Sequence, residues 1–345
     1  MKAGPGEGKS ERPHPALVST RSSWNWLLQR RSAVVLVLAM AISALRRSLI
    51  VLLLPLGGLS WAGPVSVRIV AANLTSDDHQ SWSPDNGNHS NPEGAGARIL
   101  KALRPDIVLL QEFNTSVPVR QWVNDTLGVD FSVAREEGAG IPNGIVSRFP
   151  IVNTGEWDDP VLENRDFAWA RIALPGGRIL RAVSVHLHSK TAASRNTEAE
   201  TLLGRLAKEV PGDEMVVLGG DFNTRGTEEA CLVTLGRYFV VPSAPPACTN
   251  GIIGTNAPRN RPYDWVLADP KLQALAAPVV VAGRTFPKGL VFDTRTFPAL
   301  GDLPPAQAGD SALKQMQHMA VVRQFILPEE TKPAPGAGPA PEKKE

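Results

Sequence analysis

The residues that could do chemistry most directly are Asp221 and Asn223, in the segment Gly-Gly-Asp-Phe-Asn that follows the apolar run 216–218. The apolar run is typical of a buried strand, and the two glycines mark its end. Because side chains alternate along a strand, Asp221 and Asn223 point to the same side. A carboxylate there can take a proton from water, and an amide can hold a phosphate oxygen or a developing negative charge. Gly, Asp and Asn also form surface turns, so this segment alone leaves an exposed turn open.

Five further segments place a polar residue of catalytic type beside an apolar run. They carry Asn73 after 67–72, Glu112 after 107–111, His186 and His188 in 180–188, Asp264 before 265–267, and His318 before 319–322. Short runs that are mostly apolar, as these are, are typical of strands that pack in a core. Core packing alone seldom requires one such residue at each of six strands, so the set predicts a site built from strand ends.

In this order, the six segments resemble the endonuclease/exonuclease/phosphatase superfamily. That superfamily includes secreted deoxyribonucleases, base-excision endonucleases, sphingomyelinases and inositol-phosphate phosphatases. The resemblance covers roughly residues 65 to 327 and is strongest in Gln111-Glu112 and in 219–223. It implies a domain of the α/β (α+β) class, a four-layer sandwich of two packed mixed β-sheets flanked by helices, with the site at one end of the sandwich.

The resemblance also implies a divalent cation. Hydrolysis of a phosphate ester by this route needs such an ion, an activated water and neutralisation of charge on the phosphoryl oxygens. Glu112 would be the metal ligand, with Asn73 assisting directly or through water. Mg²⁺ prefers oxygen ligands and keeps several waters, so one or two carboxylates suffice. We therefore expect Mg²⁺, with Mn²⁺ or Ca²⁺ as alternatives.

Five catalytic residues follow from the same resemblance. They are His186, Asp221, Asn223, Asp264 and His318. Asp264 would orient His318, which acts as a general base or holds the phosphate, and His186 would bind the phosphate from the opposite side. Asp221 would position or deprotonate the nucleophile. His188 lies on the same strand face as His186, and the sequence leaves open which of the two is functional.

The chain departs from the family pattern at one position. In the superfamily the last histidine usually follows an aspartate that contributes to the metal site, whereas here Gln317 precedes His318. Glutamine offers a neutral oxygen but no charge, so metal affinity should fall. Asp302 or Asp310 could supply the missing carboxylate from the preceding loop. Either a single-metal site resting on Glu112 or a scaffold without activity would be consistent with this change.

The N-terminal segment has the features of an export signal. Arg46-Arg47 precedes the apolar run 49–54, and Ser60-Trp61-Ala62 offers small residues where a signal peptidase cleaves. Residues 1–62 are therefore predicted to be a signal or targeting segment, with Met40 as an alternative true start. The protein would be secreted or periplasmic after cleavage. A membrane anchor over 33–59 is the alternative, although two central arginines would be costly there.

Charge does not favour nucleic acid over other substrates. Residues 1–62 hold eight Lys and Arg and two Asp and Glu, which leaves 28 basic and 32 acidic groups in the remainder, a formal charge of −4. A mildly acidic body has no overall attraction for nucleic acid, so a nuclease would need a local basic patch. Arg259, Arg261 and Lys190 are the basic candidates for such a patch.

The only two cysteines are Cys231 and Cys248. In an oxidising compartment a loop of this length could be closed by a disulfide, worth about 3 kcal/mol in the chain-entropy model. Two unpaired thiols are the alternative. Their spacing matches no zinc pattern.

The elements that must position the site can also be predicted. The strand before Asn73 begins near 65, a helix is predicted over 94–103, a strand over 144–151, and a hairpin over 167–174 and 178–188 joined by Pro-Gly-Gly. A second helix is predicted over 197–209, and 76–91 and 242–262 are turn-rich. One catalytic domain should cover 63–328, and the Pro- and Ala-rich residues 329–345 should be disordered.

The sequence therefore predicts an exported, metal-dependent hydrolase of phosphodiester bonds, with a slight preference for a nuclease. The alternatives are a sphingomyelinase-like or small-molecule phosphodiesterase or phosphatase, and an inactive binding protein on the same scaffold. Basic residues around the site would indicate a nuclease, whereas an aromatic or aliphatic rim, to which Trp82, Trp157 or Trp169 could contribute, would indicate a lipid substrate. No obligate protein partner is evident, and we expect a monomer.

Overall fold

A computed structural model describes residues 63–74, 94–115, 117–313, 316 and 318–329. These residues belong to one compact unit. No helix within the described ranges is long and apolar enough to cross a membrane. The predicted signal segment, the loop 76–91, Gln317 and all of the predicted tail except Glu329 lie outside the described residues.

Two β-sheets form the centre of the unit. The larger sheet has the strand order β10-β14-β1-β2-β4-β3, with β13 paired to β14, and the smaller has the order β5-β6-β7-β8-β9. The strands of the larger sheet are β1 (Val65–Ala72), β2 (Ile107–Leu110), β3 (Ser132–Arg135), β4 (Gly144–Ser147), β10 (Ala276–Ala277), β13 (Leu290–Phe292) and β14 (Ala320–Leu327). Those of the smaller sheet are β5 (Ile151–Trp157), β6 (Phe167–Ala173), β7 (Ile179–His186), β8 (Met215–Asp221) and β9 (Asp264–Ala268).

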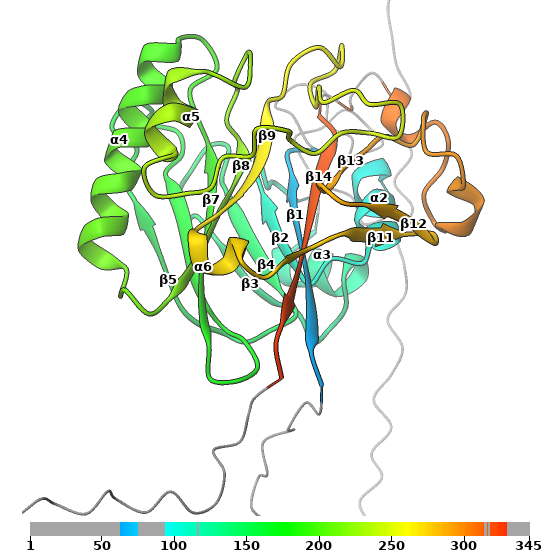
Figure 1. Cartoon of the computed structure of the whole chain (residues 1–345), viewed down its shortest axis with the longest axis horizontal. Coiled ribbons are helices and arrows are strands. Elements are labelled where there is room, and N and C mark those ends of the chain that lie inside the picture. The colour runs from blue at the N-terminus through cyan, green and yellow to red at the C-terminus, as the bar shows by residue number, and fades with distance from the viewer. Residues whose placement is uncertain (1–62, 75–93, 116, 314–315, 317, 330–345) are drawn as a thin grey trace, which may run out of the picture. The chain divides into compact units, whose positions relative to one another are not determined.

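The sheets pack face to face and helices cover their outer sides, which confirms the predicted four-layer sandwich (Figure 1). Strands β1 and β14 contact β9, and β2 contacts β7. Helices α4 (Ala192–Glu209) and α5 (Ala230–Leu235) lie against the smaller sheet, and α2 (Ala95–Leu103) and α3 (Val119–Thr126) lie on the side of the larger one. The unit is completed by the short helix α6 (Pro270–Gln273), the β11–β12 hairpin (Val279–Val281, Arg284–Phe286) and two 3-10 turns (Leu300–Asp302, Asp310–Ala312).

Alternation along β7 and β8 explains how one sheet packs on both sides. Val183 and Val185 face α4 and α5, whereas Leu180 and Ala182 join the cluster between the sheets. In a strand of period two, this places Ser184 and His186 on the face toward the other sheet. The same alternation in β8 directs Asp221 inward. The predicted catalytic residues of both strands therefore lie between the sheets and not on the helix side.

Several elements differ from the sequence prediction. The run 144–151 is split at Pro150, because β4 belongs to the larger sheet and β5 begins the smaller one at Ile151. Helix α4 starts five residues earlier than predicted, since the Thr191 hydroxyl caps it by accepting from the Ser194 amide at 3.1 Å. The last strand starts at Ala320, one residue later than the predicted run, and His318 precedes it as predicted. The β6–β7 hairpin pairs antiparallel as predicted.

Of the two alternatives for Cys231 and Cys248, the disulfide is wrong and the unpaired thiols are confirmed, because both cysteines are free and buried. Cys231 lies in α5 and packs in the cluster between the smaller sheet and its helices, whereas Cys248 packs in the cluster between the sheets. The Cys248 thiol lies 2.7 Å from Asn250 Oδ1. The two cysteines thus belong to different layers of the sandwich.

Gly220 should be essential for folding. Its φ is +141°, and an added Cβ would lie 2.0 Å from the Val185 carbonyl oxygen and 2.7 Å from Gln111 Nε2. We expect Gly220→Ala to lower the free energy of unfolding by about 3 kcal/mol or more, through backbone strain and steric clash. Gly204→Ala is the matched control, because that helical glycine has open space around it and alanine should raise stability by about 0.5–1 kcal/mol. Denaturant titration of both variants tests this, and similar midpoints would contradict it.

Candidate active site

The register of neighbouring strands brings the predicted residues to one edge of the sandwich. His186 pairs with Asp221 across the parallel strands β7 and β8, and Asp221 pairs with Asp264 across β8 and β9. In the other sheet, β1 and β2 are parallel, so Asn73 and Glu112 follow strands that end side by side. The structure thus brings together five of the seven predicted residues by strand geometry alone.

Asp221 is the centre of this group and is 1% exposed. Its Oδ2 accepts a hydrogen bond from Asn73 Nδ2 at 3.0 Å, and it lies 3.3 Å from His186 Nε2 and 3.7 Å from His318 Nε2. Asn73 Nδ2 also reaches Glu112 Oε1 at 3.2 Å. A single carboxylate oxygen therefore connects residues from both sheets.

His318 and Asp264 form the predicted pair. His318 Nδ1 lies 2.9 Å from Asp264 Oδ2, and both side chains are buried. The Asp264 amide donates to Thr255 Oγ1 at 2.9 Å, and Met319 donates to the Thr255 carbonyl at 2.7 Å. Thr255 therefore fixes the backbone next to both members of the pair.

Two site residues that follow strands have left-handed backbone conformations. Glu112 has φ of 52° and Asn223 has φ of 51°. Asparagine tolerates this conformation, but for glutamate it costs roughly 1 kcal/mol or more. The turn at Asn223 is stabilised because its amide donates to Asp221 Oδ1 at 2.8 Å, and its Nδ2 donates to the Leu187 carbonyl at 3.0 Å. One N–H of the Asn223 side chain is thus used within the fold.

The His186 ring lies among the polar side chains around Asp221, whereas the His188 ring makes its hydrogen bonds in the turn before α4. His186 is buried, with Nδ1 3.8 Å from Glu112 Oε1. His188 is partly exposed, and its Nδ1 accepts from the amides of Lys190 and Thr191 at 3.1 and 3.3 Å. The His188 ring therefore serves the turn that precedes α4.

The two histidines of the site are held in opposite protonation states. Burial lowers the pKa of His318, but the charges of Asp264 and Asp221 outweigh it and raise that pKa to about 9. Burial, Arg165 and the nearby His318 lower the pKa of His186 well below its ordinary value. Burial raises the pKa of Asp221 to about 6, against the opposing charge of His318. At neutral pH the metal-free site thus pairs a cationic His318 with a neutral His186 and an ionised Asp221.

Arg165 is a residue of this site that the sequence did not reveal. It is 7% exposed, and its Nε donates to the His186 carbonyl at 2.6 Å. Burial lowers its pKa, and the charges that oppose this most are those of Asp221 and Glu112. Arg165 thus offsets the negative charge of the two carboxylates and fixes the strand end that carries His186. It lies eighteen residues after the end of strand β4 with no motif around it, so a single sequence gives no signal for it.

Two groups of side chains could hold a divalent cation, and all of their ligand atoms are oxygens except the ring nitrogen of His318. Asn73 and Glu112 lie side by side, and Asn73 Oδ1 is buried with no hydrogen-bond partner among the described residues. Asp221, Asp264 and His318 form a second group whose ligand atoms lie within 4.8 Å of one another. Buried oxygen atoms that lack partners are the expected result where a cation normally supplies the contact. The residues present therefore fit a hard divalent ion.

Asp310 does not supply the carboxylate that Gln317 lacks. Its Oδ1 pairs with Arg98 of α2 at 2.5 Å, and its Oδ2 accepts from the Gln307 amide at 2.9 Å. Asp302 is exposed in a 3-10 turn. Both aspartates are thus used elsewhere or face solvent.

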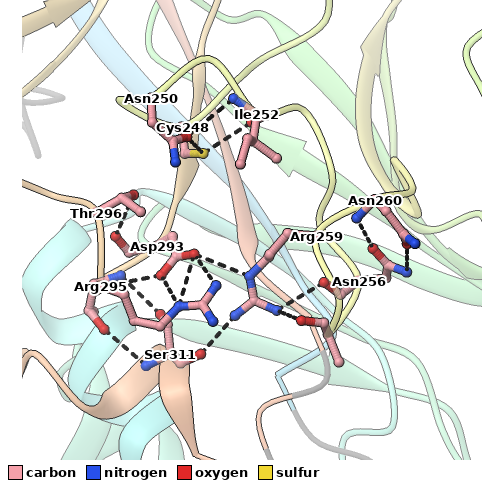
Figure 2. A network of polar contacts seen from close by, with 12 residues as sticks. Cys248, Asn250, Ile252, Asn256, Arg259, Asn260, Asp293, Arg295, Thr296 and Ser311 are labelled. Carbon is pink, nitrogen blue, oxygen red and sulfur yellow. Dashed lines mark hydrogen bonds and ion pairs between the residues drawn. The ribbon is translucent and has the colours of Figure 1, made fainter.

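The basic residues near the site differ in how they are used. Lys190 and Arg225 are exposed just beyond the ends of β7 and β8, and Arg225 donates to the Lys190 carbonyl at 3.2 Å. Arg261 is partly exposed three residues before Asp264. Arg259, in contrast, pairs with the buried Asp293 at 3.1 Å and is part of the network in Figure 2. Arg259 therefore has a structural task, and the other three remain at the surface.

Comparison with known proteins finds one matching sequence family and many solved structures with a similar fold. The model of the Endonuclease/Exonuclease/phosphatase family matches residues 86–286. The catalytic domain of human nocturnin with a bound sulfate anion is similar over 76% of this chain and 96% of that chain, at 15% identity and a TM-score of 0.52. An endonuclease/exonuclease/phosphatase from Bacteroides vulgatus covers 76% and 99% at 16% identity and 0.50.

A conserved protein of unknown function from Enterococcus faecalis V583 is similar over 76% of this chain and all of that chain, at 14% identity and a TM-score of 0.51. No curated protein sequence matches the chain. At these identities the solved structures show the fold alone, and the family match carries the assignment.

The opposite states of the two histidines can be measured. In protein treated with EDTA, we expect the His318 imidazole to stay protonated up to about pH 9 and His186 to stay neutral at pH 6.5. Asp264→Asn should lower the His318 pKa, because it removes the charge that raises that pKa most. Imidazole NMR titrations test this, with His186→Gln and His318→Gln used to assign the signals. Two histidines that both titrate near pH 6.5 would contradict the arrangement.

Proposed function

Because the chain belongs to the endonuclease/exonuclease/phosphatase family, whose members are hydrolases of phosphate esters, we propose that it is an exported phosphodiesterase that depends on a divalent cation and favours nucleic acid. The observation that carries the proposal is the convergence of both sheets on Asp221, whose Oδ2 lies within 3.7 Å of polar atoms of Asn73, His186 and His318. No structural task in the core requires this many buried polar side chains at one point.

The cation would be held by Glu112 and Asn73, with Asp221 and Asp264 as the nearest further carboxylates. We propose Mg²⁺, because the available ligands are oxygen atoms and few of them are charged; Mn²⁺ and Ca²⁺ are the alternatives. When bound, such an ion supplies a positive charge that stabilises the phosphoryl and leaving oxygens.

The side chains supply the proton transfers. Asp221 is ionised above about pH 6 and can accept a proton from the water that attacks phosphorus. His318 is cationic and neutralises charge on a phosphoryl oxygen, and it can donate its Nε2 proton to the leaving oxygen as the P–O bond breaks. Asp264 holds the His318 ring by its Nδ1. Neutral His186 and Asn223 offer N–H donors to the other phosphoryl oxygens.

The surroundings of the site favour nucleic acid over a lipid. Lys190, Arg225 and Arg261 lie beyond the strand ends that carry the catalytic residues, which is the local positive charge that a nuclease needs. Trp157 is 2% exposed and donates to Glu209 of α4, and Trp169 packs against the Arg181 guanidinium at 4.3 Å. These two tryptophans thus belong to the helix side of the smaller sheet, and Trp82 lies outside the described residues.

A sphingomyelinase-like or small-molecule phosphodiesterase remains the second candidate within the same chemistry. We propose that the enzyme acts as a monomer without an obligate protein partner. A binding protein without activity is the alternative that Gln317 suggests, and metal binding separates it from the enzyme.

Hydrolysis by the purified protein tests the proposal. We expect Mg²⁺-dependent cleavage of duplex DNA and bis(p-nitrophenyl) phosphate that EDTA abolishes, with weaker or no release of product from sphingomyelin. Asp221→Ala and His318→Ala should each lower kcat by roughly 10²-fold or more, the range of lost acid–base groups. His188→Ala is the control and should retain activity. Unchanged rates in both site variants would refute the mechanism, and a protein that neither cleaves nor binds metal by calorimetry would be the inactive scaffold.

The proposed export can be tested independently of the hydrolysis. We propose that residues 1–62 are removed during secretion, so the mature chain should begin at Gly63, two residues before β1. N-terminal sequencing of protein recovered from outside the cytoplasm tests this. A membrane-bound chain that retains the segment 33–59 would instead support the anchor.

A further inference from the structure

We propose that Arg261 and Tyr263 form a subsite for a nucleobase beside the reacting phosphate, on the side of the site where His318 lies. The inference rests on the phosphodiesterase function proposed above. It assigns the base-recognising role to two side chains that the hydrolysis itself does not use.

Tyr263 places an aromatic ring next to the catalytic histidine. The centroids of the Tyr263 and His318 rings are 5.7 Å apart and their planes are tilted by 45°. Tyr263 is partly exposed, whereas His318 is buried. A substituent of a phosphate held by His318 would therefore meet the Tyr263 ring first.

Arg261 adds a planar cation to this ring. Its Nη1 lies 3.3 Å from the Tyr263 hydroxyl oxygen, to which it donates. Within the part of the chain that the structure describes, no carboxylate lies at ion-pairing distance from Arg261, whereas Arg259 is paired with Asp293. A guanidinium group that is not neutralised can stack on a base or pair with a phosphate.

The loop 255–263 that presents these side chains is held by several hydrogen bonds within it. Asn256 Oδ1 accepts from the amides of Asn260 and Arg261 at 3.0 Å each, and Asn256 Nδ2 donates to Asn260 Oδ1 at 2.9 Å (Figure 2). The Thr255 amide donates to the Arg261 carbonyl at 2.9 Å, which closes the loop at its base. The position of Arg261 is thus fixed by hydrogen bonds from its own loop.

Arg259 anchors the same loop to the body of the protein. Its Nε pairs with Asp293 at 3.1 Å and its Nη2 donates to the Ser311 carbonyl at 2.7 Å (Figure 2). Arg259 has φ of 61°, and its carbonyl carbon would lie 2.3 Å from a Cβ added to Gly254. The buried ion pair and the close backbone contact make the loop a preorganised surface, which reduces the entropy cost of binding.

A purely structural role for the loop does not account for the two side chains. Thr255 fixes Asp264 and Met319 through its hydroxyl and its carbonyl, and Asn256 pairs with His318 through the backbone. The side chains of Arg261 and Tyr263 make none of these contacts. They are therefore available to a ligand while the loop positions the catalytic pair.

A nucleobase is the group that fits this surface. A flat ring beside a guanidinium group suits a planar aromatic partner, and stacking of one base is worth about 1–3 kcal/mol. An acyl chain would need a contiguous aliphatic surface, and a guanidinium group beside a tyrosine ring does not provide one.

Three dinucleotides separate base recognition from catalysis. They are thymidylyl-thymidine and its two analogues that lack the 5′ or the 3′ base, each assayed with Mg²⁺. Wild-type kcat/KM should fall about tenfold on one of the two analogues. Tyr263→Leu should show the same tenfold loss on the complete dinucleotide and no loss on that analogue, whereas Tyr263→Phe should keep the activity within about twofold. Tyr238→Leu, at the other tyrosine of the chain, is the matched control and should match wild type.

Other outcomes overturn the subsite. An equal loss in Tyr263→Leu on all three dinucleotides would mean that the ring only supports His318, and no loss on any of them would mean that it contacts no substrate. Cleavage of bis(p-nitrophenyl) phosphate without cleavage of any dinucleotide would refute the subsite and leave the phosphodiesterase standing. Failure to cleave any diester would refute the proposed function and the subsite with it.

Discussion

The burial of one carboxylate, Asp221, is the constraint on which the rest of the site depends. A buried charge is expensive unless hydrogen bonds and opposite charges compensate it. Here the compensation comes from the Asn73 amide, the Asn223 backbone and the cationic His318. Those partners come from three separate strand ends, so the cost of burying Asp221 is met only when both sheets are correctly packed.

The backbone around Asp221 is shaped by the same requirement. At Gly219 an added Cβ would lie 2.7 Å from Leu109 of the other sheet, and at Gly220 it would meet the Val185 carbonyl. The two sheets can approach at this point only because these two residues lack side chains. The left-handed backbone at Glu112 and Asn223 then turns each side chain back toward the gap. Close sheet packing and strained strand ends thus serve one purpose, which is to bring oxygen and nitrogen atoms of both sheets within contact distance.

The sequence was sufficient for the parts of this arrangement that are local. Apolar runs located β1, β2, β7, β8 and β9. The polar residues at their ends predicted which side chains would meet, because the buried face of each strand fixes its register and so brings the strand ends together. Arg165 was missed since its role depends on the charges of Glu112 and Asp221 and on the His186 carbonyl, all of which are distant in sequence. The disulfide prediction was wrong for the same reason, because the sequence around each cysteine does not show that α5 and Cys248 belong to different layers. The effect of Gln317 on metal affinity stays a prediction, since that residue lies outside the described ranges.

Charge balance gives a reason why the cation and the substrate should depend on each other. Glu112, Asp221 and Asp264 bring three negative charges in their ionised forms, and Arg165 and His318 bring two positive ones. With all three carboxylates ionised and no cation bound, the site would carry one net negative charge and would repel a phosphodiester, which carries one more. A divalent cation bound as proposed would make the site positive by one, so that the substrate anion would neutralise it. Since charge interactions are strong in a buried site, substrate affinity should rise steeply with metal occupancy, and the surface residues Lys190, Arg225 and Arg261 would add only a weaker, salt-sensitive attraction.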